Sequence, residues 1–129
     1  MIMMFTNKKL FTVLINDFYN CHDIETHENE YGCRIVFNAE HDIFKGHFPG
    51  QPVVPGVCMM ELVKELLQTQ LDKPLMLSSA RNVKFLGFIT PEVQPIVKIT
   101  WKSVESGYGI NASLSSGGNT LFKLDGVYV

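Results

Sequence analysis

The chain has 129 residues, a length that suits one domain and leaves little room for a second. Hydrophobic residues make up 46% and charged residues 19% of it, which excludes a disordered chain and indicates a domain with a hydrophobic core. The net charge of -2 and the lack of a basic run argue against nucleic-acid binding. We therefore expect a single domain over residues 1–129, with a small-molecule or carrier-borne substrate left open.

The cysteines and the N-terminus indicate a reducing compartment. Cys21, Cys33 and Cys58 are odd in number and form no CxxC pair, which argues against a disulfide framework or a zinc site. The apolar run at residues 10–15 is short, and residues 16–17 end it without a small-residue cleavage site. We expect a cytoplasmic protein without a signal peptide, a transmembrane segment or a bound metal.

Two strands are predicted near the N-terminus. Residues 9–17 fit either a short helix or a strand, and their pattern does not separate the two. Residues 18–27 and 33–39 predict a pair of strands, joined by a turn at residues 28–32. The residues expected on one face of the second strand are Ile35, Phe37 and Ala39.

A stiff loop precedes one long helix. Residues 41–55 contain three prolines and two glycines, which predicts a loop without regular pairing. Its apolar side chains indicate that it packs against the rest of the domain; they are Ile43, Phe44, Phe48, Val53 and Val54. From Gly56 to about Leu71 apolar residues cover a broad arc, which predicts a mostly buried helix that residues 72–74 end.

The remainder predicts four antiparallel strands. Residues 76–89 form one strand, or a strand with a bulge near Gly87. Alternating apolar residues predict strands around residues 97–102, 108–114 and 122–128, and residues 117–119 predict the last turn. One long apolar helix against a single antiparallel sheet indicates an α+β fold.

The four histidines differ in their surroundings. His22 and His27 lie on or beside a predicted strand, five positions apart, and are expected at the surface. His41 opens the stiff loop and is expected to be structural or exposed. His47 lies where glycine and proline constrain the backbone on both sides. It can be a general base with a fixed orientation or a hydrogen-bonded loop histidine, and its context alone leaves both open.

Two interpretations are also open for Glu61, in the second turn of the predicted helix. A carboxylate early in a mostly buried helix is costly unless it has a partner, which favours a functional role. Glu61 can instead begin a solvated face, with Lys64 as an ion-pair partner. That polar stripe consists of Glu61, Lys64, Glu65 and Gln68. Gly56 starts the helix, where free N–H groups and the helix dipole would polarise a carbonyl.

Taken together, these residues carry a family resemblance. The stretch Gly-His-Phe-Pro-Gly-Gln-Pro-Val-Val-Pro-Gly-Val at residues 46–57, followed by Glu61, resembles the signature of the β-hydroxyacyl-acyl-carrier-protein dehydratases of type II fatty acid synthesis. Lys84-Phe85-Leu86 and Pro91 are similar to that family's strand after the helix. The resemblance implies a hot-dog fold, in which a curved antiparallel sheet wraps one long helix.

The resemblance also implies a site and a reaction. Water would be eliminated from a 3-hydroxyacyl thioester to give a trans-2-enoyl thioester at the interface of a homodimer. A higher oligomer of such dimers is left open. His47 from one subunit would take the C2 proton and Glu61 from the other would act on the leaving hydroxyl. The substrate-binding residues would be Phe48, Pro55, Gly56 and Val57. No metal or redox cofactor is implied, and the acyl chain would arrive on the phosphopantetheine of an acyl carrier protein or on coenzyme A.

The chain departs from the family pattern at three places, the first being a shorter region before the first long strand. Glu65 stands where the family has a glutamine, which puts a second negative charge near the site, and Pro91-Glu92-Val93 replaces Pro-Gly-Asp. These changes bear on the substrate more than on the chemistry, and they leave open fatty acid synthesis and a specialised acyl or polyene pathway. The alternatives are a hot-dog acyl thioesterase, which would not need the His47 loop, and a non-catalytic acyl-binding subunit.

Overall fold

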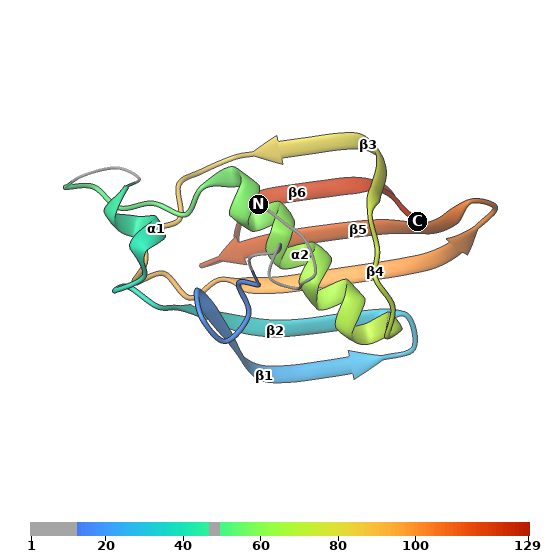
Figure 1. Cartoon of the computed structure of the whole chain (residues 1–129), viewed down its shortest axis with the longest axis horizontal. Helices are drawn as coiled ribbons and strands as arrows, with labels where there is room; N and C mark the ends of the chain where they lie inside the picture. Colours follow the sequence, from blue (N-terminus) through green and yellow to red (C-terminus); the bar gives the residue numbers. More distant parts are fainter. Residues whose placement is uncertain (1–12, 47–49) are drawn as a thin grey trace.

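The computed structural model describes residues 13–46 and 50–129 (Figure 1). Two strands and two helices come first, and four further strands follow. In chain order the elements are β1 (Tyr19–His27), β2 (Glu30–Phe37), α1 (Asp42–Lys45), α2 (Gly56–Leu71), β3 (Leu77–Phe85), β4 (Ile96–Val104), β5 (Gly107–Ser116) and β6 (Asn119–Tyr128). The predicted helix over residues 56–71 is confirmed, and Asp72 in the left-handed conformation ends it.

All six strands belong to one antiparallel sheet in the order β1-β2-β4-β5-β6-β3. Helix α2 lies across one face of this sheet (Figure 1). The strands β1 and β3 are the two edges of the sheet, so each pairs on one side only. The prediction of an α+β fold with one long helix against a single antiparallel sheet is confirmed.

The core lies between α2 and the sheet. Side chains alternate between the faces of a strand, and the inward-facing positions carry the large apolar residues. Buried members from the strands include Cys33, Ile35, Val97, Ile99, Ile110, Leu114, Phe122 and Leu124; those from α2 include Leu62, Val63, Leu66 and Leu67. This contact fixes which side of α2 faces the sheet and which side carries its polar residues.

The hairpin between β1 and β2 is tighter than predicted. Its turn is formed by residues 28–29 alone, because Asn29 adopts a φ of 62°. Tyr31 therefore pairs with Thr26, and β2 begins at Glu30. The prediction of a five-residue turn at residues 28–32 was wrong. So was the placing of Ala39 on the inner face, since it lies beyond β2 and is exposed.

Strand β3 is shorter than predicted and irregular at its start. It ends at Phe85, and its register with β6 shifts between Leu77 and Ser79 and again after Ala80. The prediction of a bulge near Gly87 was wrong, because Gly87 follows the strand. A Cβ atom at Gly87 would lie 2.8 Å from the Leu121 side chain, so the glycine allows close packing there.

The loop over residues 41–55 contains a short helix that the prediction of an irregular loop missed. His41 is its N-cap, because its Nδ1 accepts a hydrogen bond from the Ile43 N–H at 3.1 Å. Phe44 is buried against Phe18, with ring centroids 5.0 Å apart. The predicted structural role of His41 is confirmed, and so is the predicted packing of the loop at Phe44 and Val54.

The segment before β1 is a turn. Phe18 N–H donates to the Leu14 carbonyl at 2.7 Å, and Asn16 has a φ of 67°. Residues 13–17 are therefore neither of the predicted alternatives, a helix or a strand, while residues 9–12 lie outside the described residues. No helix in the described part of the chain combines the length and hydropathy needed to cross a membrane.

Candidate active site

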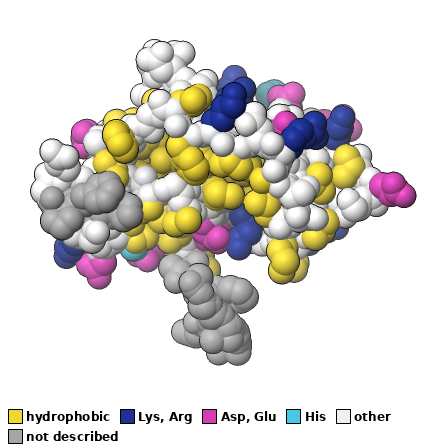
Figure 2. Space-filling view, turned by 90° about the horizontal axis from the view of Figure 1, so that it is seen from above, with side chains coloured by type: hydrophobic (Ala, Val, Ile, Leu, Met, Phe, Trp, Pro, Cys, Tyr) yellow, Lys and Arg dark blue, Asp and Glu magenta, His cyan; other side chains and the backbone are white. Residues whose placement is uncertain are grey.

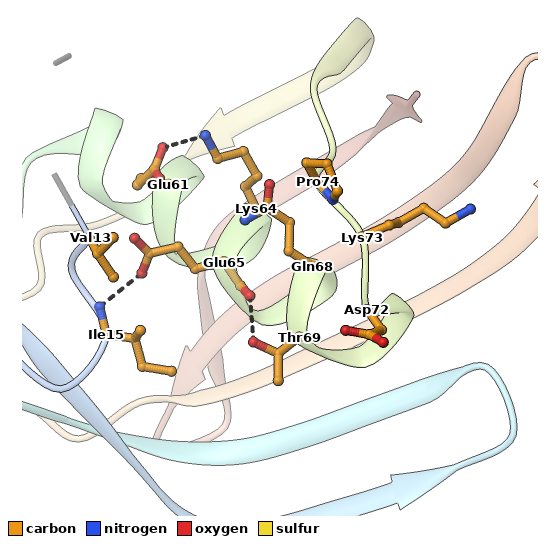
Figure 3. Close-up of a pocket in the computed structure, with 10 residues that line it drawn as sticks. All are labelled: Val13, Ile15, Glu61, Lys64, Glu65, Gln68, Thr69, Asp72, Lys73 and Pro74. Carbon is orange, nitrogen blue, oxygen red and sulfur yellow. Dashed lines mark hydrogen bonds and ion pairs between the residues drawn. The ribbon is translucent and has the colours of Figure 1, made fainter. Parts of the chain in front are cut away.

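Helix α2 presents Glu61 to a cavity of about 580 Å³ (Figure 3). One wall is the polar side of α2, including Glu61 and Gln68, and the opposite wall includes Val13 and Ile15 from the turn before β1. The turn after the helix closes the far end with Pro74 and its neighbours. Glu61 is thus a half-buried carboxylate in the wall of a hollow that opens to solvent.

Within a single chain Glu61 forms an ion pair with Lys64. The Lys64 Nζ atom lies 3.2 Å from Glu61 Oε1, and both side chains are about a third exposed, at 31% and 32%. A pair with that exposure contributes at most about 1 kcal/mol to stability. The contact is the one expected if Glu61 begins a polar face, and it is weak enough for a substrate to displace.

Glu65 lies one turn further along and behaves differently from its neighbours on the polar stripe. It is 6% exposed, the only charged residue that is buried in the described part of the chain. Its carboxylate accepts hydrogen bonds from the N–H groups of Leu14 at 2.7 Å and Ile15 at 2.9 Å, and from the Tyr19 hydroxyl at 3.0 Å. The interpretation of a wholly solvated stripe is therefore wrong at Glu65.

Burial raises the pKa of Glu65 above the usual 4.5, and the three donors offset only part of that effect. The negative charge of Glu61 adds to the rise. A raised pKa in the folded state means that the folded protein binds the proton more tightly than the unfolded chain. Ionisation of Glu65 therefore lowers the free energy of unfolding. The loss develops as the pH rises from the pKa of Glu65 in the unfolded chain through its higher pKa in the folded protein.

We expect the Glu65→Gln variant to remove this pH dependence. Relative to the variant, the native protein should lose up to about 1.4 kcal/mol of unfolding free energy per pH unit within that window. Urea unfolding of both proteins between about pH 4 and pH 8 measures the difference. If the unfolding free energies of the two proteins differ by the same amount at every pH, the pKa of Glu65 is the same in the folded and unfolded states.

A second cavity of about 490 Å³ opens at the N-terminus of α2. Apart from the helix it is formed by the end of the proline-rich loop and the segment after β3. Its lining residues are Val53, Val54, Pro55, Gly56, Met59, Phe85, Leu86, Gly87 and Phe88. The first N–H groups of a helix have no partner within it, and Pro55 at the N-cap adds no side-chain hydrogen bond. This cavity is apolar, with a helix N-terminus in its wall.

The Phe85 ring occupies the space that a side chain at residue 56 would fill. A Cβ atom at Gly56 would lie 2.8 Å from a Phe85 ring carbon, so the ring packs directly over the start of the helix. The Phe85 ring also stacks on Phe122 at a centroid distance of 5.2 Å. In this structure the space beside Gly56, a residue for which the resemblance implies a role in substrate binding, holds an aromatic ring that is half exposed.

Apolar side chains around this second cavity are unusually exposed. Phe88 is 81% exposed and Val57 is 74% exposed, and Leu86 is also exposed. Figure 2 shows hydrophobic side chains gathered across the middle of the face viewed from the β3 side. A contiguous exposed apolar patch of this kind marks an interaction surface.

The structure separates the predicted site residues into two groups. Pro55 and Gly56 line the second cavity and Glu61 lines the first, while Val57 points outward and lines neither. His47 and Phe48 lie outside the described residues. His22 and His27 are exposed, as predicted. No group of three or more potential metal ligands occurs among the residues that are described.

The chain matches the family model of the ApeI-like dehydratases over residues 23–119. A 3-hydroxyacyl-[acyl-carrier-protein] dehydratase FabZ of Clostridium acetobutylicum is 29% identical over 89 residues, which are 64% of this chain and 62% of that protein. The FabZ of Wolbachia pipientis is 34% identical over 80 residues, 54% of this chain and 52% of that protein. The matches thus span little more than half the length of these curated relatives.

Solved structures agree on the fold. The chain in the dehydratase heterocomplex ApeI:P from Xenorhabdus doucetiae is 26% identical, with a TM-score of 0.70 over 84% of this chain and 95% of that one. An uncharacterised protein from Erwinia carotovora is 22% identical, with a TM-score of 0.62 over 84% of this chain and 91% of its own, which shows the fold alone.

The six-stranded antiparallel sheet around one long helix, with cavities on α2, defines a hot-dog protein of the dehydratase type. The chain belongs to the ApeI-like dehydratase family, which confirms the resemblance read from residues 46–57 and Glu61.

Proposed function

We propose that this chain catalyses the dehydration of a 3-hydroxyacyl thioester to a trans-2-enoyl thioester. One observation carries the proposal. In a protein of the dehydratase family, helix α2 has an apolar cavity at its N-terminus and the half-buried carboxylate of Glu61 in its second turn. The cavity suits an acyl chain, and the helix N-terminus suits the thioester carbonyl, on which charge develops as the C2 proton leaves.

The roles follow from the chemistry of the elimination. The Gly56 N–H would hold the carbonyl, and His47 would take the proton from C2. The C3–O bond would then break as Glu61 gives a proton to the hydroxyl, so that water leaves and a double bond forms between C2 and C3. Exchange with solvent returns a proton to Glu61 and removes one from His47. The proposed scheme uses no cofactor, and the acyl group would be held by its carrier.

A second subunit would complete the site. In one chain the Gly56 cavity and the Glu61 cavity are separate. The exposed patch with Phe88 and Leu86 borders the Gly56 cavity. The edge strand β3 flanks the same patch with unpaired backbone groups. Docking of a second copy would bury this patch and bring the His47 loop of one chain to Glu61 of the other. Since the similar ApeI structure is a heterocomplex, a different hot-dog chain is the alternative partner.

The carrier of the acyl group would be an acyl carrier protein, which is named as the substrate carrier of the FabZ relatives. Coenzyme A would present the same phosphopantetheine thioester. A cytoplasmic location remains a prediction from the sequence, which leaves open fatty acid synthesis and a specialised acyl pathway.

The test is hydration, the reverse reaction, of short and medium trans-2-enoyl thioesters on both carriers. We expect the purified protein to remove the conjugated absorbance of the enoyl thioester without releasing free thiol. Release of thiol in place of water addition would establish the thioesterase alternative. The proposal would be refuted if the protein, alone or with a co-expressed hot-dog partner, reacted with the thioester on neither carrier. The non-catalytic acyl-binding subunit would then be the remaining alternative.

A further inference from the structure

The buried carboxylate of Glu65 has no part in the proposed reaction, yet it is the most heavily hydrogen-bonded side chain near the candidate site. Its Oε2 accepts from the Leu14 N–H, and its Oε1 accepts from both the Ile15 N–H and the Tyr19 hydroxyl. All three donors come from residues 13–19, here called the N-terminal segment. They join this segment to a helix about fifty positions away in the sequence.

These contacts hold the N-terminal segment in one position across α2. The Leu14 side chain is 4% exposed and the Tyr19 side chain is fully buried, so the Leu14 N–H and the Tyr19 hydroxyl lie where water is excluded, while the Ile15 N–H is partly buried. A buried backbone N–H without an acceptor is costly, and removal of the carboxylate would leave the Leu14 N–H in that state. Glu65 therefore adds three hydrogen bonds to the core packing of Leu14 that holds this segment.

The N-terminal segment in turn forms one wall of the Glu61 cavity. Figure 3 shows Val13 and Ile15 opposite the side of α2 that carries Glu61 and Glu65, with Glu65 joined to Ile15. The hydrogen bonds between Glu65 and the segment thus join the two opposite walls of the Glu61 cavity. A change in these bonds would alter the cavity without touching Glu61 itself.

We propose that Glu65 is a positioning residue. Its three hydrogen bonds, here called the clasp, hold the N-terminal segment against α2 and so shape the cavity in which Glu61 acts. The link to Glu61 rests on the proposed dehydratase function; the clasp itself does not. Three acceptor contacts through two oxygens suit a carboxylate better than an amide, because the amide nitrogen of a glutamine would face one of the donors.

Hydrogen exchange at single amides tests the clasp directly. In the Glu65→Ala variant we expect the Leu14 and Ile15 amides to exchange at least about tenfold faster, with protection in β4 and β5 retained. Thr69→Ala is the matched control. It removes the 3.0 Å hydrogen bond from the Thr69 hydroxyl to the Glu65 carbonyl and leaves the carboxylate contacts intact, so protection of Leu14 and Ile15 should be unchanged.

Enzyme kinetics test the link to the site. We expect Glu65→Ala to raise KM for an enoyl thioester by about tenfold or more with a smaller fall in kcat, and Glu65→Gln to recover part of the loss. If Glu65→Ala does not fold, Glu65→Gln still tests the clasp, because its amide nitrogen should speed exchange at Leu14.

The outcomes separate the two proposals. Unchanged exchange at Leu14 and Ile15 in an active Glu65 variant would overturn the clasp and leave the dehydratase function standing. Faster exchange with unchanged KM and kcat would overturn the link to Glu61. An inactive native protein whose Glu65 variants show the faster exchange would overturn the dehydratase function and keep the clasp.

Discussion

Replacement of Glu61 by glutamine is expected to lower the hydration rate of a trans-2-enoyl thioester on the order of a hundredfold or more. Glutamine has nearly the same shape but cannot give or take the proton that the leaving water requires. The loss should fall on kcat, because the Glu61 cavity keeps its form. Initial rates of the native and variant proteins, followed by the conjugated absorbance, measure the effect. His47→Gln should cause a loss of similar size.

Glu105→Gln provides the control for this substitution. Glu105 is exposed in the turn between β4 and β5 and lines neither cavity, so the same chemical change there should leave the rate unaltered. Urea unfolding of each variant checks that the fold is intact. A Glu61→Gln protein within a few-fold of native activity would show that Glu61 only pairs with Lys64 at the surface, as the alternative interpretation has it.

Mixing the two inactive variants is expected to restore activity. If each site takes His47 from one subunit and Glu61 from the other, a mixed dimer of His47→Gln and Glu61→Gln chains has one site with both native residues. Random exchange of subunits makes half of the dimers mixed, so about a quarter of the native activity should return. The physical basis is that the Gly56 cavity and the Glu61 cavity are separate within one chain.

The experiment needs proof that subunits have exchanged. Two different affinity tags, with the variants co-expressed, allow isolation of the mixed dimer alone, which should have about half the native activity per dimer. A mixed dimer that stays inactive would place His47 and Glu61 of the same chain in one site. A protein that remains a monomer in solution would require a different hot-dog chain as its partner.

Much of the fold could be predicted because its signals are local. The bounds of α2 follow from an apolar arc at helical spacing, from Pro55 and Gly56 at its start and from residues 72–74 at its end. Strands β4, β5 and β6 follow from alternation at a period of two. The turn at residues 28–29 was misjudged because Asn29 with positive φ allows a shorter hairpin than the pattern of polar residues suggested.

The candidate site was predicted only in part. The resemblance over residues 46–57 led to the dehydratase family, and the pairing of Glu61 with Lys64 followed from helical spacing. Glu65 occupies the same stripe and has a charged side chain, so spacing alone placed it in solvent. A signal was present in its departure from the family's glutamine, but nothing local indicates which donors it meets.

The sequence by itself determined the order of the six strands and the long helix, the family and the residues proposed for catalysis, because each depends on neighbours within a turn of helix, a strand or one loop. The tertiary structure alone decided that Glu65 is buried under the Leu14 amide, 51 positions away, and that Glu61 and Gly56 open into different cavities. Burial and long-range hydrogen bonding arise when the turn before β1 packs on α2, and no periodicity along the chain encodes that contact.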